Sequence, residues 1–294
     1  MKQSKLLSVF FLFCAAFIWG TAFSAQKIAA ESGVGNFYFN GVRFFIGALS
    51  LVLPVLFISR RRGKLQIRRT LLPAFCAGAV LFCASNLQQF GIDISGSAGK
   101  ASFITGLYLI LVPFANFLIF KKRPAPQAFF GAISAFAGLY FISIKPGEGM
   151  GEGDVLLLCG CLFWTAHILV IDKMAQDCDP LLFSALQFVF AGAFSLIAAL
   201  LTEDVSLASL SLCIGPLLYV GIFSSGIAYT CQVIGQQGLE PSRASIILAA
   251  ESLFGALSGV VVNHETMDAR MIFGAVMMFG GIILSQLEFR RRAK

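Results

Sequence analysis

The sequence predicts an all-α polytopic membrane protein with ten transmembrane helices, arranged as a 5+5 inverted-topology repeat with both termini in the cytoplasm. Three observations lead to this fold class. The composition is unusually apolar, ten apolar stretches have the length of a membrane span, and the second half of the chain repeats the first.

Composition limits the class of protein first. Hydrophobic residues make up 57% of the 294 residues, and charged residues only 13%. Soluble domains average roughly 45–50% apolar and about 25% charged residues. The 31 Phe and 29 Gly also suit lipid contact and close helix packing. This composition excludes a disordered chain and a soluble enzyme.

The first half contains five apolar stretches that are long enough for spans, since a helix crosses the ~30 Å hydrocarbon core with about 20 residues. They cover residues 6–27, 37–58, 71–92, 98–120 and 126–144. Lys2 and Lys5 precede the first stretch as in a signal peptide. Its apolar run is longer than a usual signal-peptide core, and the internal repeat includes it. We therefore expect a retained helix.

The second half follows the polar segment Lys145-Pro146-Gly147-Glu148 and contains five further stretches. They cover residues 153–171, 181–201, 211–235, 242–263 and 267–288. Three prolines lie in spans or at their edges, and proline removes a helical hydrogen bond. These prolines, which are Pro73, Pro113 and Pro216, can bend their helices, and we favour a packing role for them.

The basic residues predict the orientation, because cytoplasmic loops are enriched in Lys and Arg. The side that holds both termini collects 17 of the 22, namely Lys2, Lys5, Arg60, Arg61, Arg62, Lys64, Arg68, Arg69, Lys121, Lys122, Arg123, Lys173, Arg243, Arg290, Arg291, Arg292 and Lys294. The opposite side holds Lys27, Lys100, Lys145 and Arg270. We therefore expect both termini to lie in the cytoplasm. Nucleic acid is excluded as a partner, because these residues flank spans and form no groove.

An internal repeat relates the two halves, 1–146 and 147–294. An offset of 145 residues superimposes the only two tryptophans, Trp19 and Trp164. From the third helix onward the offset is 143, which superimposes Pro73 on Pro216, Gly131 on Gly274 and Gly138 on Gly281. Five helices are an odd number, so the halves must cross the membrane in opposite directions. Inverted repeats recur in secondary transporters, although channels have them too.

Several segments resemble a known family, and they are Phe17-Ile18-Trp19-Gly20-Thr21, Asn40-Gly41-Val42-Arg43-Phe44, Thr105-Gly106-Leu107-Tyr108 with Pro113, Arg243-Ala244-Ser245, Ala250-Glu251, Glu265 and Gly274. Over essentially the whole chain they resemble the two EamA domains of the drug/metabolite transporter superfamily. The resemblance implies a ten-helix carrier of small metabolites, often an exporter, with a central cavity formed by the first four helices of each half. Two departures are Glu251-Ser252, where the family often has Glu-Pro, and Lys122 at the repeat position of Glu265.

Three ionisable residues inside the spans are candidates for the site, because charge in lipid is costly and is often functional. Glu251 is a substrate or proton site, or else a structural residue that pairs with Arg43 or forms a hydrogen bond to a neighbouring helix. Arg43 clamps a carboxylate or phosphate, or it extends to the interface; we favour a structural role. His167 titrates near neutrality, or it packs through a hydrogen bond, which we favour.

Aromatic and amide side chains complete the candidate substrate cavity. Trp19 and Trp164 lie near mid-span and suit cavity walls or helix packing, and Tyr108 and Tyr229 offer hydroxyl groups. The candidate amides are Asn40, Asn86, Gln88, Gln89 and Gln232, of which Gln89 and Gln232 are related by the repeat; such amides can also cap helices or meet headgroups.

These features predict a secondary transporter in the bacterial inner or plasma membrane that works by alternating access, and a small-molecule exporter of metabolites, amino acids or drug-like compounds is the leading hypothesis. A channel-like permease is the alternative, and a membrane-embedded enzyme is less favoured because the chain has only two histidines and one deep acid. No motif indicates a cofactor, a metal site or a nucleotide-binding loop. Proton coupling and facilitated diffusion both fit, and the substrate and oligomeric state stay open.

Overall fold

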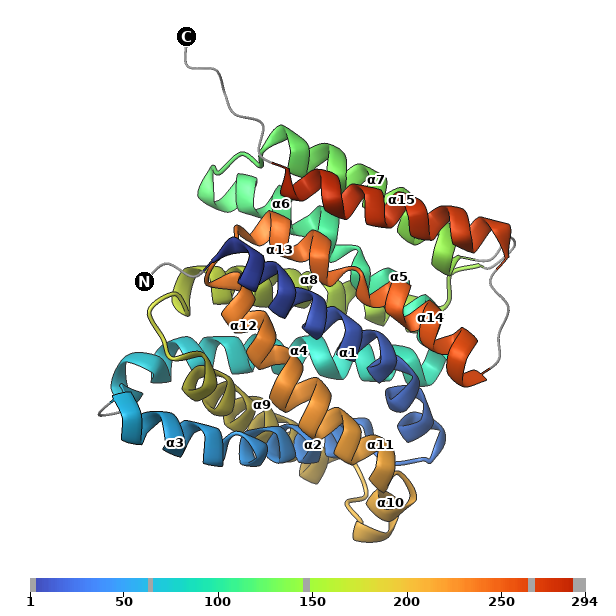
Figure 1. Cartoon of the computed structure of the whole chain (residues 1–294). Coiled ribbons are helices and arrows are strands. Elements are labelled where there is room, and N and C mark those ends of the chain that lie inside the picture. The colour runs from blue at the N-terminus through green and yellow to red at the C-terminus, as the bar shows by residue number, and fades with distance from the viewer. Residues whose placement is uncertain (1–3, 63–65, 145–148, 264–267, 288–294) are drawn as a thin grey trace.

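The computed structural model describes residues 4–62, 66–144, 149–263 and 268–287, and these ranges contain helices but no β-strand (Figure 1). In this part of the chain, eight helical segments are long and apolar enough to cross a membrane, and Pro126–Ile142 forms a shorter apolar helix. The expected all-helical, polytopic membrane fold is confirmed. The count of ten crossings stays a prediction.

Every predicted span of the first half falls on helix. The helices are α1 (Lys5–Glu31), α2 (Asn36–Ser50), α3 (Val52–Arg62), α4 (Ile67–Ser95), α5 (Ala98–Gly106), α6 (Tyr108–Phe120) and α7 (Pro126–Ser143). Two spans are divided, at Leu51 and at Leu107, where the expected helices were continuous. Pro73 and Pro113 lie inside α4 and α6.

The second half has the same order with more interruptions. Its helices are α8 (Glu152–Met174), α9 (Pro180–Thr202), α10 (Leu207–Leu212), α11 (Ile214–Tyr219), the π-helix η1 (Val220–Tyr229), α12 (Thr230–Gln236), α13 (Pro241–Leu248), α14 (Glu251–Asn263) and α15 (Ala269–Gln286). Pro216 lies in the first turn of α11, where the N–H groups lack helical partners in any case. The α13–α14 break at Ala249 and Ala250 forms without proline, and Ala250 is the repeat equivalent of Leu107.

The helices lie side by side in one bundle, and α1 begins at the same end at which α15 ends (Figure 1). Helices α7 and α15 pack together along one edge. Gly131 approaches the carbonyl oxygen of Gly281, and Gly138 approaches that of Gly274, so closely that a Cβ atom would overlap it. One residue number rises as the other falls, so α7 and α15 are antiparallel.

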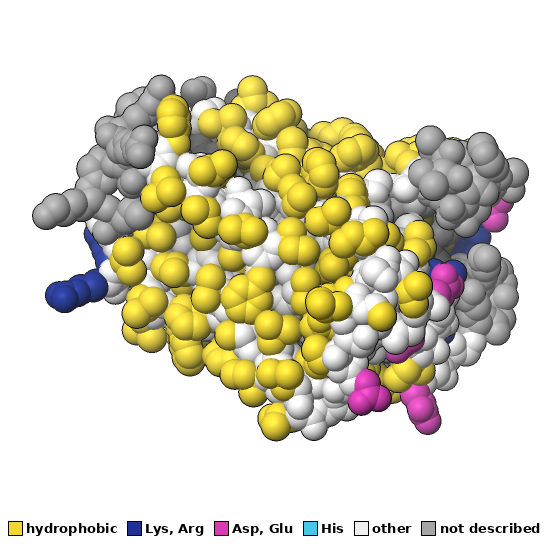
Figure 2. Space-filling view, turned by 90° about the horizontal axis from the view of Figure 1, so that it is seen from below, with side chains coloured by type: hydrophobic (Ala, Val, Ile, Leu, Met, Phe, Trp, Pro, Cys, Tyr) yellow, Lys and Arg dark blue, Asp and Glu magenta, His cyan; other side chains and the backbone are white. Residues whose placement is uncertain are grey.

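The outer surface is apolar around its middle and charged at its ends. In Figure 2 hydrophobic side chains cover the centre of the face, Lys and Arg project at the left end, and acidic side chains cluster at the right. Some residues used to predict orientation or repeat register lie outside the described residues, namely Lys2, Lys64, Lys145, Glu265, Arg290, Arg291, Arg292 and Lys294, and the side chains of Arg60, Arg61 and Arg62 are likewise outside the description.

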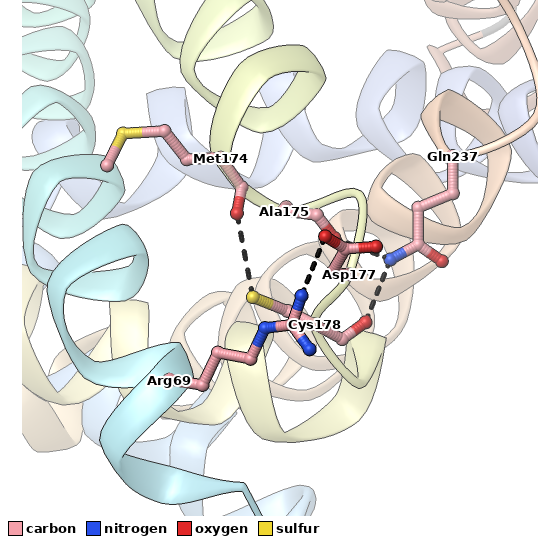
Figure 3. Close-up of polar contacts among 6 residues, drawn as sticks. All are labelled: Arg69, Met174, Ala175, Asp177, Cys178 and Gln237. Carbon is pink, nitrogen blue, oxygen red and sulfur yellow. Dashed lines mark hydrogen bonds and ion pairs between the residues drawn. The ribbon is translucent and has the colours of Figure 1, made fainter.

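Polar contacts fasten the turn between α8 and α9 to its neighbours (Figure 3). Gln237 donates from Nε2 to the carbonyl oxygens of Ala175 (2.7 Å) and Cys178 (2.9 Å). Arg69 of α4 pairs with Asp177 at 2.8 Å, but both side chains are exposed. Burial raises the pKa of the Cys178 thiol, which keeps it protonated. Three segments distant in sequence therefore meet at the basic end of the bundle.

Candidate functional site

A small cavity lies where helices of both halves meet. It offers about 30 Å³ to the centres of water-sized molecules, which is room for roughly two waters. The lining residues come from eight helices and are Trp19, Phe23, Gln26, Arg43, Gln88, Thr105, Tyr108, Trp164, Ser224, Tyr229 and Glu251. Seven of these are sequence candidates, namely Trp19, Arg43, Gln88, Tyr108, Trp164, Tyr229 and Glu251. In this conformation the cavity is too narrow for a metabolite.

Tyr229 is the centre of the aromatic wall. Its ring packs edge-on against Trp19, with centroids 4.8 Å apart, and stacks on Trp164 at 6.1 Å. His167 and Phe188 contact the same ring at 5.9 and 5.7 Å. Tyr229 ends the π-helix η1, and π-helical turns are frequent at functional sites. The repeat-related indoles therefore share one partner in the cavity.

Hydrogen bonds fix both indoles. Trp19 donates from Nε1 to the carbonyl oxygen of Ser224 (3.2 Å), and Trp164 donates to Oε1 of Gln88 (2.9 Å). The Gln88 oxygen also accepts from Thr105 at 3.3 Å. Both rings are thus oriented by groups that themselves line the cavity.

Glu251 is 3% exposed and is the first residue of α14. Its Oε1 accepts a 3.0 Å hydrogen bond from the hydroxyl of Tyr108, the first residue of α6. A carboxylate at a helix N-terminus is favoured by the helix dipole. Gly20 of α1 lies against the Glu251 carbonyl oxygen so closely that a Cβ would overlap it. The break in the ninth predicted span therefore places a carboxyl group at the cavity wall.

Arg43 is 2% exposed and does not extend to the interface. Its guanidinium carbon lies 4.7 Å from the ring centre of Phe44 and 5.9 Å from that of Phe39. Within the described ranges, no carboxylate forms an ion pair with Arg43, and its Nε has no hydrogen-bond partner. The Arg43–Glu251 pair considered from the sequence is not formed.

Five sequence candidates lie outside the cavity lining. Asn40 donates to Asn86 at 2.8 Å, and Asn86 donates to Ser195 at 3.0 Å, which joins α2, α4 and α9. His167 Nε2 donates to Oε1 of Gln187 at 3.1 Å. The remaining two, Gln89 and Gln232, are buried, and Gln89 donates to the carbonyl oxygen of Gln26. Asn40, Asn86 and Gln89 therefore join helices, and none of the five residues lines the cavity.

Sequence reasoning missed four lining residues, which are Phe23, Gln26, Thr105 and Ser224. A signal for two of them was present. Trp19, Phe23 and Gln26 are spaced by four and three residues, so they share one helix face. Gln88 and its neighbour Gln89 were both candidates, and the rotation of α4 decides that Gln88 faces the cavity. Among the described residues, no group of three metal-ligating side chains could hold a metal ion.

Comparison with known proteins agrees with this architecture. The EamA-like transporter family matches residues 6–144 and 151–287. An uncharacterized transporter of Archaeoglobus fulgidus is 30% identical, over 93% of this chain and 83% of its own. The S-adenosylmethionine/S-adenosylhomocysteine transporter of Chlamydia trachomatis serovar D is 23% identical, over 97% of this chain and 91% of its own.

A further relative, the uncharacterized transporter YwfM of Bacillus subtilis, is 27% identical over 94% of this chain and 92% of its own. A solved crystal structure superimposes with a TM-score of 0.79 at 17% identity, covering 96% of this chain and 97% of that one, which establishes the fold alone. The chain belongs to the EamA-like transporter family and is a multi-pass protein of the cell membrane.

Proposed function

We propose that this membrane transporter is a secondary carrier that exports a small molecule by alternating access around the cavity between its halves. The observation that carries the proposal is the composition of the wall. Trp19 and Trp164, which are equivalent in the repeat, both line the cavity and both contact Tyr229. A site shared by two related halves is suited to exposure to either side in turn.

Inverted topology is supported by the helix packing. Helices α7 and α15 are repeat equivalents and they pack antiparallel. Two hydrogen bonds join residues that are 143 positions apart, Ser134 to the carbonyl of Met277 (2.9 Å) and Tyr108 to Glu251. A residue can touch its own equivalent only near a two-fold axis. We therefore assign halves 1–146 and 147–294 to opposite orientations about an axis through these contacts.

The proposed topology has ten crossings and cytoplasmic termini. The described basic residues support it, because Arg68 and Arg69 begin α4 and the run Lys121–Arg123 follows α6 at the same end. The test is labelling of intact cells with a membrane-impermeant maleimide. Ser206→Cys should react and Lys122→Cys should not. Labelling of Lys122→Cys without labelling of Ser206→Cys would show that both termini lie outside the cytoplasm.

The solute is a small metabolite, amino acid or drug-like compound. One relative is named an S-adenosylmethionine/S-adenosylhomocysteine transporter, which adds nucleoside-like amino acids to the compounds worth testing. Glu251 and His167 are the residues through which protons would be coupled, and facilitated diffusion is the alternative.

Reconstitution tests the carrier directly. Liposomes that contain the purified protein are loaded with a mixture of amino acids, nucleosides and organic amines, and released solutes are measured by mass spectrometry against protein-free liposomes. A released solute is then offered in labelled form. Saturable uptake that rises when the unlabelled solute is inside identifies a carrier, and flux without saturation or counterflow identifies a channel. Absence of any flux refutes both.

A further inference from the structure

Arg43 is the one feature of the cavity wall that the packing of the protein does not explain. It lines the cavity and is almost fully buried. Its guanidinium group carries five N–H donors; among the described residues its Nε has no hydrogen-bond partner, and no carboxylate forms an ion pair with it. It lies against the faces of Phe39 and Phe44, which orient the group but supply no acceptor to Nε.

Burying a charged residue without a partner costs free energy. A buried charge without a counter-ion retains most of its desolvation penalty, and within a membrane this cost marks a functional residue. Packing does not require the charge, because the repeat equivalent of Arg43 is Phe188, which stacks parallel to Phe44 at 6.0 Å. An apolar side chain thus fills the corresponding place in the second half.

The nearby carboxyl group does not supply the missing partner. Glu251 lines the same cavity, but its hydrogen bond goes to Tyr108, and it lies at the N-terminus of α14. The cavity therefore presents the cationic side chain of Arg43 on α2 without a counter-ion among the described residues, while the carboxyl group of Glu251 is hydrogen-bonded to Tyr108. The aromatic wall of Trp19, Trp164 and Tyr229 offers contact area for the body of a ligand.

We propose that Arg43 is the receptor for an anionic group, a carboxylate or a phosphate, on the transported solute. The inference rests on the proposed carrier function. Guanidinium binds both groups through two parallel N–H···O bonds, which lysine cannot reproduce. Solutes that carry such a group enter the cavity, and amines without one do not.

The two tryptophans provide the assay, because the only indoles of the chain both line this cavity. Four compounds with one branched body are titrated against intrinsic fluorescence: 4-methylpentanoate, L-leucine, 3-methylbutyl phosphate and 3-methylbutylamine. Comparison of the carboxylate with the phosphate distinguishes the two sources of the anion. Iodide, with acrylamide as the neutral control, probes the local charge near the indoles without requiring a good ligand.

In the wild type, the anion-bearing compounds should bind and the amine should not. Arg43→Gln should weaken their binding at least about tenfold, since hydrogen bonds to charged groups are worth about 1.5–3 kcal/mol and 1.4 kcal/mol is tenfold. Arg43→Lys should retain part of the affinity. Iodide quenching should fall about twofold in Arg43→Gln, with acrylamide quenching unchanged. Size-exclusion chromatography and thermal unfolding check that both variants fold.

The proposal is overturned if the amine binds as well as its anionic analogues, if Arg43→Gln keeps wild-type affinity, or if iodide quenches Arg43→Gln as strongly as the wild type. Binding is measured without transport, so the two proposals fail separately. Anion binding without flux in liposomes would refute the carrier and keep the receptor. Flux of amines alone would keep the carrier and refute the receptor.

Discussion

A single methyl group added at the α7–α15 contact tests the two-fold arrangement of the halves. A Cβ on Gly138 would overlap the carbonyl oxygen of Gly274 and the backbone nitrogen of Met278. A Cβ on Gly281, the repeat equivalent of Gly138, would overlap the carbonyl oxygen of Gly131 in the same way. Gly280, on the same helix, has nothing within 4 Å of its Cβ position. The chain thus supplies a matched control.

The size of the effect follows from this geometry. Replacing a helical glycine by alanine gains up to about 1 kcal/mol of helix propensity at any of these positions, so this gain cancels in the comparison. What remains is the clash with backbone atoms, which cannot rotate away as a flexible side chain would. Overpacking of this kind costs about 1–3 kcal/mol. Gly138→Ala and Gly281→Ala should each be less stable than Gly280→Ala by that amount.

The free energy of unfolding is measured by SDS titration in mixed micelles, followed by tryptophan fluorescence. Equal stability of Gly138→Ala and Gly280→Ala would refute the close approach of α7 and α15. A loss in Gly138→Ala without a similar loss in Gly281→Ala would refute the two-fold relation, because the axis makes the two contacts equivalent.

Three further substitutions test the site and the ends of the bundle. Glu251→Gln should reduce transport and alter its pH dependence in the liposome assay while the bond from Tyr108 can still form; full transport with an unchanged pH profile would remove Glu251 from the mechanism. Asp154→Asn should destabilise the protein by about 3 kcal/mol in the SDS titration, because Asp154 is 1% exposed and pairs with Lys100 at 2.5 Å; a loss below about 1 kcal/mol would show that the pair contributes little. Arg69→Gln, which breaks an exposed pair, should change stability by no more than about 1 kcal/mol.

The fold was predictable because lipid imposes a coarse rule on the sequence. An apolar run of about 20 residues is helical in a membrane, since every backbone group must find a partner within the segment. The same rule does not predict where a membrane helix is broken along its length. Leu107 and Ala250 are apolar, so hydropathy passes through both breaks without a change. What places Tyr108 and Glu251 at helix starts is backbone geometry inside a packed bundle, which hydropathy does not encode.

The site was predictable where chemistry alone singles out a residue. Charge in a span identified Glu251 and Arg43, and the repeat identified the two indoles. The role of an amide side chain was harder to predict, because it can form hydrogen bonds either to a neighbouring helix or to a ligand. Asn86 joins helices while Gln88 faces the cavity, and a rotation of 200° along α4, two residues at about 100° each, separates them. Only the packing of α4 determines that rotation.

The two halves are alike at the α7–α15 contact and at the two cavity tryptophans, and they differ at other positions around the cavity. The glycine contacts between α7 and α15 are equivalent under the repeat. In contrast, the repeat equivalent of Arg43 is Phe188, which packs behind the cavity on Tyr229, and the equivalent of Tyr108 is Glu251. Similar packing keeps two conformations close in energy, which a carrier needs in order to alternate. Dissimilar walls give the solute one favoured orientation, with its anionic group on α2. Exchanging the identities of residues 43 and 188 should therefore move the anion site to α9 without preventing folding. Iodide quenching that persists in the exchanged protein and is then lost on replacing Arg at position 188 by Gln would support this inference, and loss of the anion site on exchange would refute it.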